Sequence, residues 1–290
     1  HPDLVNRLAD EAGKAAQHVL NMCVRALDYC PPVDLTFGEY LRALVTADVD
    51  LVPEDGRDYR VAFVEAFRRR GLYPRDLRTL SVENLRWRGP EEDDRRPSDA
   101  LTGIMQEMRS GAHKQLYAKT RKDIFDEERR TRFLLHRRLT KHFASGDEGR
   151  RDAEFLGLSP DESESFEVHS AHFATRLRPD GTPQLRLFFQ LTQEVPVPGP
   201  EGSEAKMVFQ GGSTVVVDLK EPRVTYCIRK PVSSLTRRER QRRHLAAQAE
   251  HGLRATYFGP PEAFITGGDD EDRRRRTLRE PFALLHRATG

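Results

Sequence analysis

The sequence predicts an α+β protein, because helical and strand periodicities occupy different parts of the chain. In the first half, apolar residues recur every three or four positions, which is typical of amphipathic helices. From Phe166 onward they alternate with other residues between Pro- and Gly-containing turns, which indicates antiparallel strands. We therefore expect an N-terminal helical unit, a charged helical connector and a C-terminal antiparallel β-meander domain with one helix.

Three short-looped helices are expected in residues 1–88. The first runs from Pro2 to Tyr29, with a stripe of Leu4, Leu8, Ala12, Ala15, Val19, Cys23, Ala26 and Leu27. Thr36 and Glu39 have the spacing of a capping box, so the second helix should begin there. Its inward residues should be Phe37, Tyr40, Leu41, Leu44 and Val45. A third helix should end at Gly71.

Residues 89–160 are expected to form the charged connector. The mixed-charge run Arg88–Pro97 has almost nothing to bury and should be a loop. Ser98–Phe143 is predicted to be helical, and the acidic stretch Ser145–Glu164 is a candidate boundary. The inward candidates are Leu101, Ile104, Met105, Met108, Leu116, Ile124, Phe125, Phe133, Leu134 and Leu139.

Residues 161–290 are expected to form the antiparallel β accessory domain. A hairpin turns at Pro179-Asp180-Gly181, and two further strands follow to give a four-stranded meander. A basic helix is predicted from about Ser234 to Glu250. Pro281–Leu285 should dock back on the sheet.

Composition limits the classes of function. The 48 basic and 46 acidic residues nearly cancel, so the chain has no net field toward nucleic acid or an anionic membrane. No apolar run approaches the length of a membrane span. The three cysteines form no CxxC pair, which favours a reducing compartment, and we expect a cytoplasmic location.

Three segments, read in order, carry a resemblance to a known family. They are Arg25-Ala26-Leu27 with Tyr29; Phe37 with Leu41-Arg42-Ala43, Val45 and Asp50-Leu51; and Ala66-Phe67 with Gly71-Leu72. Together they resemble the last helices of the C-terminal lobe of thermolysin-like zinc metallopeptidases, the gluzincins. The resemblance covers only about residues 1–80, and an unrelated three-helix unit with the same periodicity is the alternative.

The resemblance implies that this chain lies beyond the catalytic residues of such a peptidase. None of the ten histidines is followed by Glu, so the chain has no His-Glu-x-x-His pentad. His1 lies too close to Arg25 to be the transition-state-stabilising histidine of that family. We therefore assign no catalytic, cofactor-binding or metal-binding residue here, and zinc is expected on the missing N-terminal part. Whether the whole polypeptide is an enzyme stays open.

Four smaller constellations have plain structural interpretations. Cys23 and Cys30 are more typical of core packing than of redox chemistry. His169 and His172 should point to opposite faces of a strand and share no metal. Gly211-Gly212 before Ser213 indicates a bulge or a close backbone contact. Solvated loop charge is favoured over calcium binding for Asp48, Asp50, Glu54 and Asp55.

The strongest charge signal lies in the predicted basic helix. Its candidate contacts to an anion or partner are Arg237, Arg238, Arg240, Arg242 and Arg243. A second run, Arg273–Arg276, directly follows Asp269–Asp272, which favours internal pairing. Few aromatic residues interleave with the arginines, so nucleic acid is disfavoured as a partner.

The sequence thus supports two hypotheses. The leading one is a non-catalytic C-terminal portion of a thermolysin-like metallopeptidase, whose β-rich accessory domain recognises a substrate or partner or regulates the enzyme. Its partners would be the N-terminal catalytic part and a further protein not identified by the sequence. The alternative is a stand-alone protein-interaction module that binds an anion or nucleic acid through its Arg-rich helix.

Overall fold

The computed structural model describes residues 2–91, 96–160, 166–177, 181–199 and 206–250. The chain divides into two compact units. The first contains His1–Val195 and Gln210–Ser233, and the second contains Pro196–Phe209 and Ser234–Gly290. These units differ from the predicted segments 1–88, 89–160 and 161–290, because parts of all three belong to the first unit. The predicted docking of Pro281–Leu285 lies outside the described residues.

Most of a four-stranded antiparallel sheet belongs to the first unit and forms its middle. Its strands follow the order β1-β2-β3-β4, and their bounds are Phe166–Leu177, Pro183–Pro198, Lys206–Asp218 and Arg223–Lys230. β1 pairs with β2 through partners such as Phe173 and Leu187, and β3 pairs with β4 through Val215 and Cys227. The predicted meander and the α+β class are confirmed.

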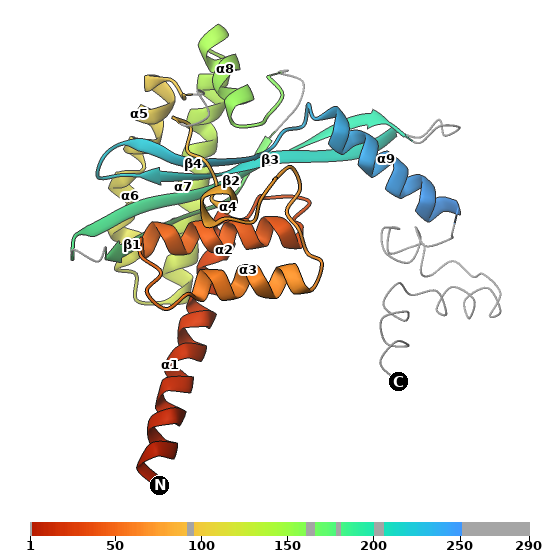
Figure 1. Ribbon diagram of the computed structural model, residues 1–290. Coiled ribbons are helices and arrows are strands. Elements are labelled where there is room, and N and C mark those ends of the chain that lie inside the picture. Colours follow the sequence, from red (N-terminus) through yellow and green to blue (C-terminus); the bar gives the residue numbers. More distant parts are fainter. Residues whose placement is uncertain (1, 92–95, 161–165, 178–180, 200–205, 251–290) are drawn as a thin grey trace, which may run out of the picture. The chain divides into compact units, whose positions relative to one another are not determined.

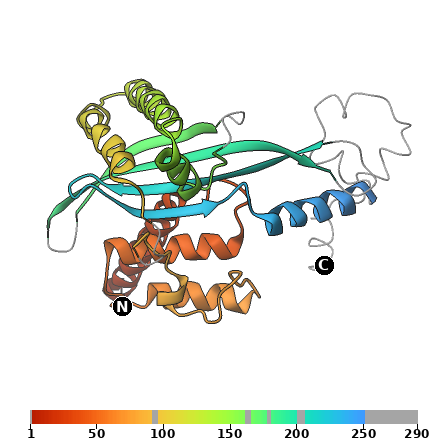
Figure 2. The same ribbon diagram turned by 90° about the horizontal axis from the view of Figure 1, so that it is seen from above.

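Helices cover both faces of the sheet within the first unit (Figures 1 and 2). One layer contains α1 (Pro2–Ala26), the 3₁₀ turn η1 (Leu27–Tyr29), α2 (Phe37–Leu51), α3 (Tyr59–Arg69) and α4 (Val82–Leu85). The other contains α5 (Asp99–Glu107), α6 (Arg109–Leu116), α7 (Arg121–Phe143) and α8 (Asp147–Phe155). None of the helices in the described ranges combines the length and apolarity needed to cross a membrane.

Strand alternation divides the core into two clusters, one on each face of the sheet. Phe188, Tyr226 and Ile228 pack with α1, η1 and α2. Leu187 and Phe189 face the other way and pack with residues of α5, α7 and α8. Because both faces are covered, the sheet of this unit is a structural layer between helices.

Local signals place the ends of α2 and α3 as predicted. The Thr36 hydroxyl accepts from the Glu39 amide, and the Glu39 carboxylate accepts from the Thr36 amide at 2.9 Å, which completes the capping box. Gly71 has a φ of +69°, and the next amide, that of Leu72, donates to the carbonyl of Phe67 at 3.0 Å. This positive φ suits glycine and ends α3.

Several predicted inward positions are wrong. Phe37 is 69% exposed, because the first helical residue lies beside the cap and not over the core. Leu27 is also exposed, since the chain tightens into η1 at that residue. In α7, Phe125 and Phe133 face outward, whereas Leu135 and Leu139 fill the core. The acidic stretch predicted as a boundary contains α8, whose Phe155 is buried.

A buried ion pair joins the first helical layer to the sheet. The Arg186 guanidinium of β2 contacts both carboxylate oxygens of Asp50 near the end of α2, one of them at 2.8 Å. The Tyr29 hydroxyl donates to the same carboxylate and accepts from Arg186 at 2.7 Å. Burial raises the pKa of Tyr29, so the phenol stays protonated and able to donate.

We predict that Arg186→Met lowers the free energy of unfolding by about 3–5 kcal/mol, because it leaves the Asp50 carboxylate poorly compensated inside the protein. Urea denaturation measures the loss. The double variant Arg186→Met/Asp50→Leu should be less destabilised than the single one. The control Arg130→Met removes an exposed pair with Glu127 and should leave the transition unchanged. A single variant as stable as the control would contradict this role.

The close backbone contact predicted at Gly211-Gly212 is confirmed. A Cβ at Gly212 would lie 1.9 Å from the Leu191 carbonyl oxygen of the neighbouring strand, and its φ is +151°. We predict that Gly212→Ala destabilises the fold by at least about 3 kcal/mol. Gly103→Ala in α5, where nothing lies within 4 Å of the added Cβ, should instead stabilise by up to about 1 kcal/mol. Thermal and urea denaturation of both variants test this contrast.

Candidate functional site

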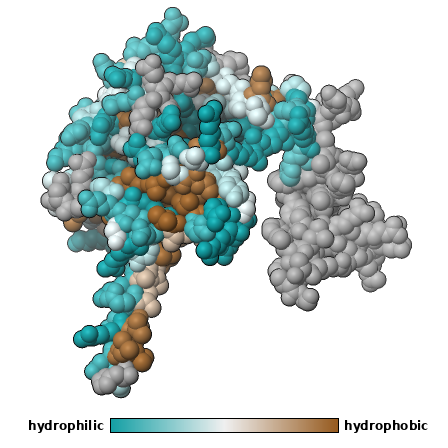
Figure 3. All heavy atoms as spheres, viewed as in Figure 1, coloured by the Kyte–Doolittle hydropathy of each residue, from teal (hydrophilic) through white to brown (hydrophobic). Residues whose placement is uncertain are grey.

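The N-terminal half of α1 presents an apolar face that no described part of the chain covers. Residues 2–14 are all exposed, and Leu4 and Leu8 are 57% and 62% exposed. Figure 1 shows this end of the helix projecting from the first unit, and Figure 3 shows apolar side chains along it. Unpartnered helices of this kind are marginal in water, so the face is a candidate docking surface.

The exposed face continues the face that α1 buries in its own core. The stripe recurs at helical spacing as Leu4, Leu8, Ala12, Ala15, Val19, Met22 and Ala26. Met22 and Ala26 are buried against the sheet side of the first layer, Ala15 and Val19 are half-buried, and the earlier members are exposed. Among the described residues, this continuous stripe therefore has a partner in its second half only.

Charges on the polar side of α1 are balanced. Three acidic residues and three basic residues lie on the helix: Asp3, Asp10 and Glu11, with Arg7, Lys14 and Arg25. Lys14 and Glu11 form an exposed pair at 2.8 Å. The helix therefore lacks the basic polar face that attracts amphipathic helices to anionic membranes.

The acidic residues near the end of α2 are structural, contrary to the prediction of solvated loop charge. Asp48 is buried and pairs with Arg60 of α3 at 2.9 Å, while Asp50 holds Arg186. Asp55 accepts from the Tyr59 amide at 2.9 Å at the start of α3. Glu54 alone is exposed as predicted. Among the described residues, no group of His, Cys, Asp or Glu is arranged to hold a metal ion.

Ser98, Asp152 and His142 lie together but are not arranged as a catalytic triad. His142 Nε2 lies 2.6 Å from Asp152 Oδ2, and the Ser98 hydroxyl donates to the same oxygen at 2.5 Å. The hydroxyl is bound to the carboxylate and not to the imidazole, so the three groups do not make the serine–imidazole hydrogen bond of a triad. Ser98 instead caps α5, accepting from the Leu101 amide at 3.0 Å. The cluster fixes α5, α7 and α8 to one another.

The two predicted strand histidines have separate surroundings. His169 is exposed, and its backbone carbonyl accepts from Arg132 at 3.2 Å. His172 stacks on Phe188 with ring centroids 5.4 Å apart and lies 3.3 Å from Asp28. A register shift falls between Val168 and Ser170, so the regular alternation of faces is interrupted at His169. Neither contact suggests a shared ligand.

The predicted arginines lie on α9 (Leu235–Glu250) of the second unit. The guanidinium groups of Arg237 and Arg238 lie over the ring of Phe209, at 4.8 and 5.6 Å from its centroid. Arg242 and Arg243 pair with Glu239 at 2.8 and 2.9 Å. Only Arg240 is exposed without such a contact in the part of this unit that the structure describes. The second basic run, Arg273–Arg276, lies outside the described residues.

The core role predicted for Cys23 and Cys30 agrees with their burial. Both belong to or pack against the cluster between the first helical layer and the sheet. The Cys30 thiol donates to the Ala26 carbonyl at 3.3 Å. Burial raises the pKa of Cys30 to about 12, with the nearby Asp28 and Glu39 adding to the shift.

We predict that Cys30 resists alkylation at pH 8, where a thiol of such pKa is only about 0.01% thiolate. Its reactivity should rise with pH up to its raised pKa, as long as the protein stays folded. Iodoacetamide labelling followed by peptide mass spectrometry measures the rate at each cysteine. The variant Cys23→Ser separates the two neighbouring thiols, and rapid labelling of Cys30 in the folded variant would contradict the burial.

No protein-family model matches the chain, and no match was found among curated proteins or solved structures. The resemblance of residues 1–80 to a thermolysin-like lobe therefore stays a prediction based on the quoted residues. Among the surfaces of the first unit, the uncovered half of α1 bears most directly on function.

Proposed function

We propose that this chain is the non-catalytic C-terminal portion of a thermolysin-like zinc metallopeptidase, and that the N-terminal half of α1 packs against the catalytic part of the same polypeptide. The uncovered stripe of α1 is the observation that supports this most directly. The catalytic part would bind the zinc ion through its own His-Glu-x-x-His residues. This chain would contribute none of the metal ligands.

Continuity of the stripe favours an intramolecular partner. Leu4 and Leu8 extend the face that Met22 and Ala26 bury, so a partner placed over them would extend the same hydrophobic core. The balanced charge of α1 does not favour a membrane surface. The apolar face of this helix is best suited to pack against an apolar surface of a folded protein domain.

The packing of the three segments that carry the resemblance is consistent with a lobe. The last turns of α1 with η1 pack against α2, and α2 packs against α3. Phe67 of α3 borders a cluster built on Leu41 and Val45 of α2. These helices would then buttress the catalytic part from one side.

Under this proposal, the covered sheet limits the surfaces through which the accessory region could bind a partner. Both faces of the sheet in the first unit carry helices, so a partner would meet helices or strand edges and not a sheet face. Recognition of a substrate or regulation would therefore involve helical surfaces or strand edges.

The coding region upstream of His1 gives the first test. We expect one open reading frame that encodes a His-Glu-x-x-His pentad before this chain, and about one zinc ion per full-length polypeptide by metal analysis. A frame that lacks the pentad would end the peptidase assignment and leave the stand-alone interaction module.

Hydrogen exchange gives the structural test. We predict that amides of residues 2–14 exchange quickly in the 290-residue chain and become protected in the full-length polypeptide, because their apolar face is then buried. Amides of α7 serve as the internal control and should exchange alike in both proteins. Equal exchange of residues 2–14 in both would refute the docking.

Two matched variants sharpen that test. Leu8→Glu places a charge on the apolar stripe, whereas Asn6→Glu places the same charge on a polar position of the same helix turn. Both should leave the 290-residue chain unchanged, since both positions are exposed there. Only Leu8→Glu should remove the protection of residues 2–14 in the full-length polypeptide. Loss of protection in neither variant would count against the stripe as the contact.

A further inference from the structure

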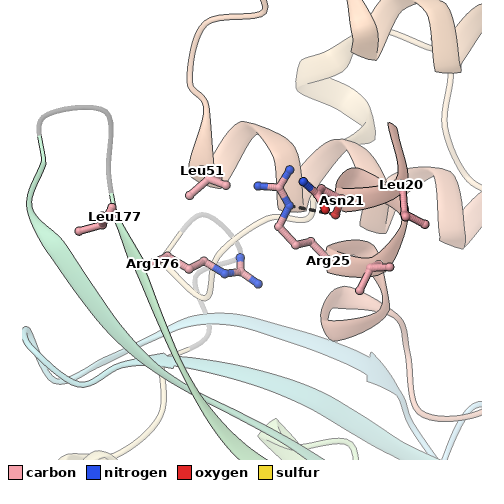
Figure 4. A pocket seen from close by; sticks show the side chains of 7 residues that line it. Leu20, Asn21, Arg25, Leu51, Arg176 and Leu177 are labelled. Carbon is pink, nitrogen blue, oxygen red and sulfur yellow. Dashed lines mark hydrogen bonds between the residues drawn. The ribbon is translucent and has the colours of Figure 1, made fainter. Parts of the chain in front are cut away.

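A groove between α1, the end of α2 and β1 combines an apolar lining with two arginines. Its volume is about 470 Å³, within the range of small-molecule sites. The lining residues are Leu20, Asn21, Val24, Arg25, Leu51, Arg176 and Leu177. Figure 4 shows the guanidinium groups of Arg25 and Arg176 extending into the space between α1 and β1. The groove lies on a different face of α1 from the stripe of Leu4 and Leu8.

Arg25 is a half-buried cation without a carboxylate partner among the described residues. Its Nε donates to the Asn21 carbonyl at 3.0 Å, which is the hydrogen bond drawn in Figure 4. The nearby carboxylate of Asp48 is already paired with Arg60 at 2.9 Å. The terminal nitrogens of Arg25 are therefore available to an anion that enters the groove.

The charges around the groove also indicate that Arg25 lacks a carboxylate partner. Among the described residues, four guanidinium groups and three carboxylates lie around the groove: Arg25, Arg60, Arg176 and Arg186, with Asp28, Asp48 and Asp50. Arg176 is held in place, donating to Asp28 at 3.2 Å and to the Tyr29 hydroxyl at 3.0 Å. Within the described residues, one positive charge is left without a carboxylate partner, and it lies on Arg25.

The surroundings of Arg25 disfavour its charge. Burial lowers the pKa of the Arg25 guanidinium, and although the charge of Asp48 opposes this shift, the like charge of Arg176 adds to it. An anion bound beside Arg25 would offset both unfavourable effects. The four apolar side chains would meanwhile repel a small, fully hydrated ion such as sulfate.

We propose that this groove binds a carboxylate attached to an aliphatic group. The carboxylate would lie on Arg25, and the aliphatic group would cover Leu20, Val24, Leu51 and Leu177. A free fatty acid and the C-terminal residue of an apolar peptide both present this chemistry. The inference stands independently of the proposed peptidase, because it uses only the first unit of this chain.

Isothermal titration calorimetry with the 290-residue protein tests the proposal. The probes are octanoate, octanol, acetate, and acetyl-Leu-Leu with either a free or an amidated C-terminus. We expect octanoate or the free-acid peptide to bind at least tenfold more tightly than its uncharged counterpart, and acetate to bind undetectably. Which of the two binds identifies the source of the carboxylate.

Three variants locate the binding. Arg25→Gln removes the cation and Val24→Ser the apolar wall, and each should weaken binding at least tenfold; Val24 is 56% exposed and tolerates the change in folding. Arg7→Gln, an exposed arginine of the same helix, is the matched control and should bind as the unchanged protein. Circular dichroism confirms that each variant folds. Absence of binding by any probe at millimolar concentration, or equal affinity in all three variants, would overturn the proposal.

Discussion

The ion pair between Asp50 and Arg186 is the constraint on which the first unit depends. It connects residues 136 positions apart in the chain and lies where α2 meets the sheet. Two charges removed from water are costly unless each is hydrogen-bonded, and here Tyr29 supplies a further donor and acceptor between them. The helical layer and the sheet are therefore fixed in one relative position, since any shift would leave a charge unsatisfied.

This interaction also gives a physical role to one part of the sequence motif. Asp50-Leu51 belongs to one of the segments on which the predicted resemblance to the thermolysin-like lobe is based. In this fold, Asp50 anchors the sheet and Leu51 lines the groove beside α1. The same dipeptide thus connects α2 both to the strands of the sheet and to a surface that a ligand can reach.

Local sequence signals predicted the ends of helices well, but they did not predict which side chains pair across elements distant in the sequence. The capping box of Thr36 and Glu39 and the stop at Gly71 each depend on neighbouring residues, so the sequence reveals them. The paired glycines indicated a close contact at Gly212, but not that its partner is the Leu191 carbonyl of another strand. The pairing of Asp48 with Arg60, or of Asp50 with Arg186, depends on how helices pack, and nothing in the local pattern distinguishes such carboxylates from solvated ones. The groove at Arg25 was missed for the same reason, because its walls come from three separate elements.

Periodicity also could not tell which half of α1 is buried. The stripe from Leu4 to Ala26 is uniform in sequence, yet only its second half has a partner in the described fold. The amphipathic pattern indicates that a helix face will be covered, but it does not indicate which element or partner covers it. Both faces of the sheet in the first unit are occupied by helices, and α1 carries two candidate binding surfaces on different faces. One is the apolar stripe at its free end; the other is the groove wall around Arg25, where an uncompensated charge adds chemical selectivity that the stripe lacks.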